Sequence, residues 1–244
     1  MSDVHTPHAF VTAGAKGIGA AVVRALRDSG FHVTLTYRNS PADETVLKDE
    51  GVFATYCEIS DPESVQEAFS AAESKFGPVD VLVANAGMTK DTLLLRMSEE
   101  DFTSVIDTNL TSAYRLAKRA LPSMIRSRSG RIVFISSVVA FMGSAGQVNY
   151  AASKAGIVGL ARSLAREVAS RSITVNVVAP GAVDTDILHA AGASRTDSIV
   201  QAIPQGRLGT PEEIAEAVKF LSSPGAAYVT GVVLPVDGGL AMGI

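Results

Sequence analysis

The sequence offers little that would support a disulfide, a metal centre or a membrane span. Its only cysteine, Cys57, excludes an internal disulfide. No cluster of histidine, cysteine and acidic residues suggests a metal ion, and His189 is interpreted as a loop residue. The most apolar long stretch, residues 150–170, does not predict a membrane span, because it contains Lys154, Arg162, Arg166 and Glu167.

Strong charge of one sign is also absent. The formal net charge is −4 at pH 7, and no basic run indicates a nucleic acid or an anionic membrane surface as partner. The first eight residues, MSDVHTPH, are polar and lack the apolar centre of a signal peptide. We therefore expect a cytoplasmic protein that binds neither nucleic acid nor membrane.

The chain does contain a regular alternation of strand-like and helix-like segments. Its 244 residues are 47% hydrophobic, enough for one large α/β domain. Seven apolar runs suit strands buried on both faces: AFVTA, HVTLTY, VFATYC, DVLVANAG, RIVFISS, TVNVVAPG and VVLPVDGG. The alternation predicts a single-domain, Rossmann-type doubly wound parallel sheet over residues 8–244, preceded by a flexible tail, residues 1–7.

Two helix starts carry clear signals. Asp61 and Pro62 predict an N-cap followed by proline at the first helical position, at the start of a helix over 61–76. Thr210 and Glu213 predict a capping box at the start of the last helix.

A glycine-rich loop, AGAKGIG, lies between the first run and the first helix. Its glycines let backbone amides approach a pyrophosphate at the helix start, which predicts a nucleotide site formed by Gly14, Lys16, Gly17, Ile18 and Gly19. Ala13 stands where the usual fingerprint has its first glycine. We expect a negative φ at Ala13, because a positive one would cost roughly 1–2 kcal/mol.

The end of the second run indicates which dinucleotide binds. NAD sites place an acidic residue there to bond the ribose 2′-hydroxyl, whereas this chain has Arg38 in the segment TYRNS. Arg38 and Lys16 would pair with a 2′-phosphate, which predicts NADP(H).

A set of four residues suits carbonyl reduction. Tyr150 and Lys154 share one helix face, Ser137 ends the strand-like run RIVFIS, and Asn109 lies inside an otherwise regular helix. Hydride delivery to a ketone needs a proton donor at the developing alkoxide. We expect Lys154 to lower the pKa of Tyr150 and Ser137 to hold the carbonyl oxygen beside it.

Together these motifs resemble the short-chain dehydrogenase/reductase family along the chain from residue 8 onward. The resemblance implies a seven-stranded sheet, a catalytic tetrad of Asn109, Ser137, Tyr150 and Lys154, and a water held by the asparagine in a proton relay. It also implies further cofactor contacts from Glu58, Ile59, Asn85, Ala86, Gly87, Pro180, Gly181, Val183 and Thr185, with Tyr150 and Lys154 near the nicotinamide end. Ala13 and Glu58 depart from the family pattern, which usually has glycine and aspartate there.

Longer segments resemble one branch of that family, the bacterial 3-oxoacyl-[acyl-carrier-protein] reductases. They are NAGMTKDTLLLRMSEEDF, the stretch from GQVNYAASK to VVAPG, and PVDGG. The resemblance implies NADPH-dependent reduction of a 3-oxoacyl thioester in fatty-acid synthesis, substrate contacts from Ser137 and Gln147, carrier docking at Arg128 and Arg171, and a homotetramer. An acidic carrier would be steered by basic residues.

Two alternatives stay open at this stage. One is a reductase of the same fold that acts on acetoacetyl-CoA, a polyketide, a sugar or a steroid. The other is a protein that binds NADP as a sensor without turnover, which the presence of both Tyr150 and Lys154 disfavours. The segment 184–208 would cover the substrate pocket, with apolar contacts for an acyl chain from Ile187, Leu188, Ile199 and Ile203.

Overall fold

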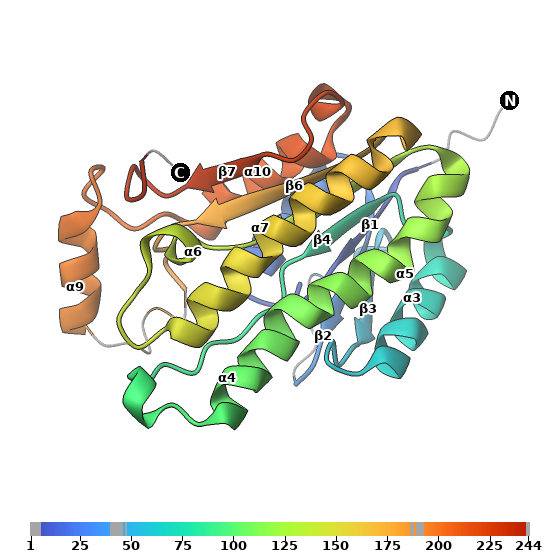
Figure 1. The fold of residues 1–244 in the computed structure, drawn as a ribbon. Coiled ribbons are helices and arrows are strands. Elements are labelled where there is room, and N and C mark those ends of the chain that lie inside the picture. Colours follow the sequence, from blue (N-terminus) through green and yellow to red (C-terminus); the bar gives the residue numbers. More distant parts are fainter. Residues whose placement is uncertain (1–5, 40–45, 47, 186–187, 189–192, 243–244) are drawn as a thin grey trace, which may run out of the picture.

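The computed structural model describes residues 6–39, 46, 48–185, 188 and 193–242. Its centre is one sheet with the strand order β3-β2-β1-β4-β5-β6-β7 (Figure 1). All neighbouring strands pair in parallel. The strands are β1 (His8–Val11), β2 (His32–Tyr37), β3 (Val52–Tyr56), β4 (Val81–Ala84), β5 (Gly130–Ile135), β6 (Ile173–Pro180) and β7 (Val233–Val236). The predicted seven-stranded parallel sheet is confirmed.

The central strands are buried on both faces, as their apolar composition predicts. Every residue of β1, β4 and β6 is buried. Successive side chains of a strand point to opposite faces. Phe10 therefore joins the core on one face of the sheet, whereas Ala9 and Val11 join the core on the other.

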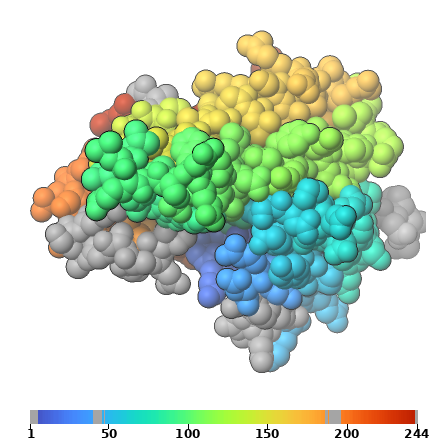
Figure 2. Space-filling view, turned by 60° about the horizontal axis from the view of Figure 1, so that its bottom comes forward, coloured from blue at the N-terminus to red at the C-terminus, as the bar shows by residue number. Residues whose placement is uncertain are grey.

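Among the residues that the structure describes, five long helices cover the two faces. On one face lie α3 (Pro62–Phe76), α5 (Ser112–Ser127) and α7 (Val148–Val168), which run side by side in Figures 1 and 2. On the other face α1 (Gly17–Asp28) packs along α10 (Pro211–Ser222). Shorter helical elements are α4 (Glu99–Ile106), α6 (Val139–Met142), α9 (Ala193–Ala202), a π-helix (Asp107–Thr111), and 3₁₀ turns at Leu94–Arg96, Ala169–Arg171 and Pro224–Ala226.

Both predicted helix starts are confirmed. The carboxylate of Asp61 accepts a hydrogen bond from the backbone N–H of Glu63 at 3.0 Å, and Pro62 is the first residue of α3. Thr210 Oγ1 accepts from the N–H of Glu213 at 3.3 Å, while Glu213 Oε2 accepts from the N–H of Thr210 at 2.8 Å. Each cap satisfies amides that a helix start leaves without partners.

The strand order places a crevice at one edge of the sheet. The chain runs outward from β1 through β2 to β3 and then returns to β4 on the other side of β1. Loops that leave the carboxyl ends of β1 and β4 diverge at this switch point, which is where ligands bind in open α/β sheets. The glycine loop and the NAG segment are these two loops.

Candidate active site

The glycine loop is shaped by close contacts that exclude side chains. A Cβ on Gly14 would lie 2.6 Å from Leu35 Cβ, and one on Gly19 would lie 2.1 Å from the carbonyl oxygen of Ala13. Gly17 has a φ of 51°. Lys16 is the N-cap of α1 and makes no side-chain cap bond. The first amides of α1 are therefore not capped by Lys16, and the loop fits a pyrophosphate at the helix start.

Our prediction for Ala13 is wrong, because its φ is 51°. Its N–H donates to Thr36 Oγ1 at 3.3 Å, and its carbonyl oxygen accepts from Asn85 Nδ2 at 3.4 Å. The next amide, of Gly14, donates to the carbonyl oxygen of Thr36 at 3.0 Å. These contacts from β2 and from the loop after β4 hold Ala13 in the left-handed region, at a cost of roughly 1–2 kcal/mol.

Thr12 joins the two loops of the crevice, and the sequence motifs did not single it out. It is fully buried, and its Oγ1 accepts hydrogen bonds from the N–H groups of Asn85 and Ala86, each at 3.0 Å. Asn85 Nδ2 also donates to the carbonyl oxygen of Thr12 at 3.0 Å. The NAG segment is thus fixed against the glycine loop.

Arg38, Glu58 and Ile59 follow β2 and β3 at the end of the crevice that we call the adenosine end, because the sequence predicts adenosine contacts there. Arg38 Nη1 lies 3.8 Å from Glu58 Oε2. The side chain of Ile59 is buried. Lys16 follows β1 at the same edge of the sheet. Arg38 and Lys16 could therefore pair with a phosphate group at this edge of the sheet.

The Pro-Gly segment approaches the glycine loop from the other side. Gly181 donates to the carbonyl oxygen of Val236 at 3.0 Å, and a Cβ on it would lie 2.7 Å from Asp237 Cα. Pro180 ends β6, and Val183 is buried in a bridge to Gly209. Thr185 Cγ2 lies 3.6 Å from the position of a Cβ on Gly17. The structure therefore brings Thr185 to the glycine loop.

Asn109 lies in a π-helix, Asp107–Thr111, rather than in regular α-helix. Such turns are frequent at functional sites. The side chain is buried, and its Oδ1 accepts from the N–H of Met88 at 2.8 Å. Its Nδ2 donates to the carbonyl oxygen of Met88 and to Ser153 Oγ, both at 2.9 Å. Asn109 thus ties the segment after the NAG motif to α7.

Gly87 lies between Asn109 and Lys154. A Cβ on Gly87 would be 3.2 Å from Asn109 Oδ1 and 3.3 Å from Lys154 Nζ. The absence of a side chain at residue 87 therefore lets the backbone of the NAG segment approach both polar groups.

Ser137 and Tyr150 are brought together by β5 and α7. Ser137 follows β5 and is buried, and Tyr150 lies in the first turn of α7. The side chain of Ser137 lies close enough to Tyr150 to act on its pKa. Two further serines, not singled out from the sequence, fix this part of α7. Ser153 Oγ donates to the carbonyl oxygen of Tyr150, and Ser136 Oγ to that of Lys154, each at 2.8 Å.

The expected lowering of the Tyr150 pKa is wrong for the free protein. Desolvation raises the pKa of Tyr150, the side chain of Ser137 opposes this, and the charge of Asp91 adds to the rise. Lys154 Nζ lies 5.7 Å from the centre of the Tyr150 ring and donates to the carbonyl oxygen of Ile135 at 2.8 Å. Burial lowers the pKa of Lys154 itself to about 8. The Lys154 ammonium is thus directed at the carbonyl oxygen of Ile135. Desolvation is the largest cause of the pKa shift at both Tyr150 and Lys154.

The segment of residues 88–92 is hydrogen-bonded to the segment just before Tyr150. Gln147 Nε2 donates to both oxygens of Asp91, at 3.1 and 2.9 Å. The N–H of Thr92 donates to the carbonyl oxygen of Gly146 at 2.8 Å, and Asn149 Nδ2 donates to that of Lys90 at 3.0 Å. Gln147 therefore lies beside the site, three residues before Tyr150, with its amide turned to Asp91.

The segment predicted to cover the substrate is described only in part. Ile187 and His189 lie outside the described residues. Leu188 and Ile199 are half-buried. Ile203 is buried, with its Cγ2 2.8 Å from the position of a Cβ on Gly238, so it packs beneath the C-terminal segment.

Arg128 and Arg171 lie together but far from the other predicted residues. Arg128 caps the end of α5, and its Nη2 donates to the carbonyl oxygen of Ser170 at 3.1 Å. Arg171 ends the 3₁₀ turn after α7. Both helix ends lie at the edge of the sheet opposite the start of α7 (Figure 1). The helical rise alone separates Tyr150 from Val168 by about 27 Å.

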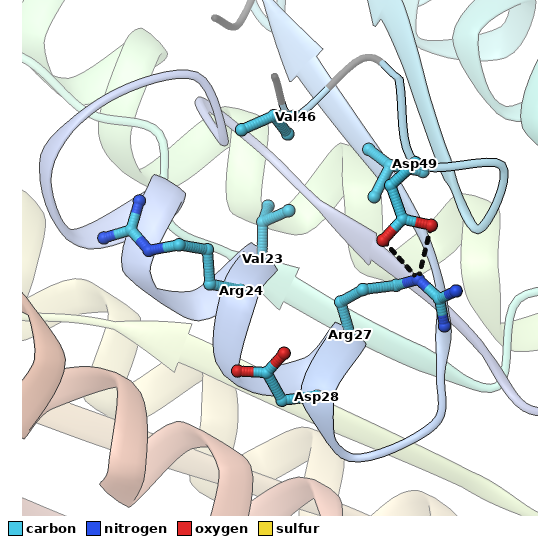
Figure 3. Close-up of a pocket in the computed structure, with 7 residues that line it drawn as sticks. Val23, Arg24, Arg27, Asp28, Val46 and Asp49 are labelled. Atoms are coloured by element: carbon cyan, nitrogen blue, oxygen red, sulfur yellow. Dashed lines mark hydrogen bonds and ion pairs between the residues drawn. The ribbon is translucent and has the colours of Figure 1, made fainter.

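The residues around a hollow on the α1 face make contacts that support the fold. It is lined by Val23, Arg24, Arg27, Asp28, Val46, Asp49 and Val52 (Figure 3). Arg27 Nε donates to both carboxylate oxygens of Asp49, at 3.0 and 2.8 Å. Arg27 Nη1 also donates to the carbonyl oxygen of Phe31 at 3.3 Å. These contacts hold the segment before β3 against α1.

Neither a metal cluster nor a membrane span is found in the described parts of the chain. Over these residues no three histidine, cysteine or acidic side chains gather as metal ligands. None of the helices described here is long and apolar enough to cross a membrane.

Comparison with known proteins places this geometry in a family. The family model described as "Enoyl-(Acyl carrier protein) reductase" matches residues 12–241. The 3-oxoacyl-[acyl-carrier-protein] reductase MabA of Mycobacterium tuberculosis is 47% identical over 234 residues, 96% of this chain and 92% of that protein. The 3-oxoacyl-[acyl-carrier-protein] reductase FabG of Vibrio cholerae is 46% identical to this chain over 237 residues, and FabG of Escherichia coli is 45% identical over 239 residues. Each match covers 96% of this chain and 97% of the relative. The chain belongs to the short-chain dehydrogenase/reductase family.

Proposed function

We propose that the protein is an NADPH-dependent reductase that converts 3-oxoacyl-[acyl-carrier-protein] to the 3-hydroxyacyl form in fatty-acid synthesis. The observation that carries the proposal is the approach of Asn109 and Lys154 to Gly87, with Lys154 Nζ 5.7 Å from the centre of the Tyr150 ring and Tyr150 beside Ser137. The relatives named 3-oxoacyl-[acyl-carrier-protein] reductase cover nearly the whole chain, which supports the same substrate class. We also propose that the protein is located in the cytoplasm.

The side chains divide the acid–base work. Ser137 holds the ketone oxygen next to the Tyr150 hydroxyl, and Tyr150 donates its proton as that oxygen gains negative charge. The raised pKa of Tyr150 keeps the phenol protonated at neutral pH. The Lys154 ammonium stabilises the phenolate that remains after transfer. Asn109 is a positioning residue here, because its amide holds Met88 and Ser153.

NADPH would supply the hydride, and this chain's residues would bind and orient it. Gly14, Gly17 and Gly19 admit the pyrophosphate, and Lys16 and Arg38 pair with the 2′-phosphate. Asn85, Ala86 and Gly87 form one wall of the crevice, with Pro180, Gly181, Val183 and Thr185 on the other side of the glycine loop. Glu58 and Ile59 border the adenosine.

Carrier docking at Arg128 and Arg171 would require a second subunit. Within one chain the two arginines lie at the edge opposite Tyr150, roughly a full length of α7 away. In a homotetramer the pair of one subunit can face the crevice of another. Exposed apolar side chains on α5 and α7, those of Tyr114, Ile125 and Val148, support such an assembly. Sedimentation should give a tetrameric mass, and a monomeric mass would refute this part.

Mixing a docking variant with a variant that lacks the proton donor tests the docking. Arg128→Glu with Arg171→Glu should slow turnover of the carrier-bound substrate while sparing a small thioester. Mixed tetramers of this variant with Tyr150→Phe should regain carrier-bound turnover if docking and chemistry occur on different subunits. Equal loss on both thioesters would argue against docking at these arginines.

The activity itself is tested by following NADPH absorbance. Acetoacetyl thioester should be reduced on acyl carrier protein and, more slowly, on coenzyme A, and NADH should serve poorly. A crotonyl thioester is the control, because the family description names an enoyl reductase. Reduction of crotonyl but not acetoacetyl thioester would replace the proposed reaction. Turnover of neither, with NADPH bound, would favour another ketone or a sensor.

A further inference from the structure

Arg38 and Glu58 are the two charged residues that the sheet register places side by side at the adenosine end. Tyr37 of β2 pairs with Tyr56 of β3. Arg38 follows β2 directly, and Glu58 follows β3 after Cys57. Their closest charged atoms, Arg38 Nη1 and Glu58 Oε2, are 3.8 Å apart. An anion bound by Arg38 therefore lies close to the carboxylate of Glu58.

Glu58 is fixed in place by hydrogen bonds. Its Oε1 accepts from the N–H of Ser60 at 3.2 Å and from Ser60 Oγ at 2.7 Å. Its own N–H donates to the buried Ser64 Oγ at 2.9 Å, and its carbonyl oxygen accepts from the N–H of Asp61 at 3.0 Å. Both the carboxylate and the backbone of Glu58 are thus held by the turn that leads into α3.

Arg38 is held far less firmly. Its side chain is 57% exposed, against 28% for Glu58, and its contact with the carboxylate is long. Exposed ion pairs of this kind contribute little to stability. When a phosphate group enters, Arg38 can turn to it, whereas Glu58 stays where Ser60 holds it.

We infer that Glu58 is a specificity-determining residue, whose fixed carboxylate weakens binding of a 2′-phosphate and so reduces the preference for NADP(H) over NAD(H). The inference rests on the proposed use of NADP(H). Two effects act in the same direction. The carboxylate repels the phosphate, and it competes with the phosphate for the Arg38 guanidinium.

The test uses two probes that differ only in the 2′-phosphate, 2′,5′-ADP and 5′-AMP. Their dissociation constants are measured calorimetrically with the full chain in its native assembly. Glu58→Gln removes the charge and keeps an oxygen that can accept from Ser60. We expect 2′,5′-ADP to bind about fivefold more tightly to this variant at low salt, with 5′-AMP changed less than about twofold.

Three controls separate the charge of Glu58 from other effects. Glu63→Gln removes an exposed carboxylate in the first turn of α3 and should leave both constants unchanged. Ser60→Ala keeps the charge but releases it from one hydrogen bond, and should strengthen 2′,5′-ADP binding by a smaller factor, about twofold. The gain in Glu58→Gln should shrink at about 1 M salt, where the screening length falls to roughly 3 Å.

The outcomes distinguish this inference from the proposed function. Unchanged or weaker binding of 2′,5′-ADP to Glu58→Gln would overturn the inference, and weaker binding would show that Glu58 orients Arg38 instead. Equal binding of the two probes to the unaltered protein would refute selection of NADP(H). The effect of Glu58→Gln on the dissociation constant of 2′,5′-ADP would still decide the inference about Glu58.

Discussion

The two ends of the crevice differ in how firmly their side chains are held. At the end near Tyr150, which we call the reactive end, Lys154 and Asn109 are buried and held by hydrogen bonds of 2.8–2.9 Å. At the adenosine end, Arg38 is exposed, and its Nη1 lies 3.8 Å from Glu58 Oε2. The reactive end is supported by the π-helix, by Ser153 and by Ser136. Polar groups at that end are positioned before any ligand binds, which favours catalysis because little reorganisation is then needed. We expect the adenosine end to adjust when a ligand binds, and we expect small changes there to alter selectivity between the two dinucleotides.

The largest expected effect comes from removing the proton donor. Tyr150→Phe should lower kcat for acetoacetyl-carrier reduction by about 10²–10⁴-fold, the usual contribution of a general acid. The dissociation constant of 2′,5′-ADP should be unchanged, because the adenosine end is untouched. Steady-state kinetics and calorimetry on the same preparation measure both quantities. A variant that kept more than about a tenth of the activity would show that another group donates the proton.

The second largest effect is expected from a substitution in the glycine loop, between the adenosine end and the reactive end of the crevice. Gly19→Ala would place a Cβ 2.1 Å from the carbonyl oxygen of Ala13 and 2.7 Å from Asn85 Nδ2. We expect a loss of stability of about 1–3 kcal/mol, measured by denaturant unfolding, and dinucleotide binding weakened at least tenfold. Gly209→Ala is the matched control, because a Cβ there meets nothing closer than 3.7 Å. Similar losses in both variants would contradict the close approach at Gly19.

The pH dependence tests the reactive end alone. With a pKa of about 8, Lys154 carries its charge below that pH and loses it above. The value of kcat/KM, which reports groups of the free enzyme, should therefore fall roughly tenfold per pH unit above about 8. A profile that stays flat to pH 10 would contradict the requirement for the ammonium.

Deprotonation of Lys154 should not itself destabilise the folded protein. Burial depresses the pKa of Lys154 in the folded state to about 8, from its ordinary value of 10.5. Between these two pH values the unfolded chain binds more protons than the folded one, so the contribution of Lys154 to stability rises with pH across this window. Thermal melting at pH 7.5 and 9.5 separates the two effects, because activity should fall while this contribution to stability increases.

The smallest effect is expected at Ala13. Ala13→Gly removes roughly 1–2 kcal/mol of strain but adds flexibility to the unfolded chain, for a net gain of about 0.5–1 kcal/mol in the free energy of unfolding. Denaturant unfolding measures it, with little change expected in kcat. A destabilised variant would show that the left-handed conformation of Ala13 carries less strain than its φ of 51° implies.

The fold follows closely from local sequence patterns. The seven apolar runs become the seven strands, and the caps at Asp61 and Thr210 form as expected, because strand burial and helix capping depend on a few neighbouring residues. Ser137 and Tyr150 also meet as predicted, since β5 and α7 deliver them to the same edge of the sheet.

What the sequence did not predict depends on partners that are distant along the chain. The φ of Ala13 is set by Thr36 and Asn85, which belong to the end of β2 and the loop after β4. The raised pKa of Tyr150 comes from burial in the folded chain rather than from its spacing to Lys154. The clustering of Arg128 with Ser170 at the far edge follows from the lengths of α5 and α7 together.

One measurement tests the central claim most directly, the rate of NADPH loss with acetoacetyl-[acyl-carrier-protein], for the unaltered protein and Tyr150→Phe in parallel. The account predicts rapid oxidation by the unaltered protein, at least about 100-fold slower oxidation by the variant, and equal binding of 2′,5′-ADP to both. Equal rates in the two proteins, or no oxidation by either, would contradict it.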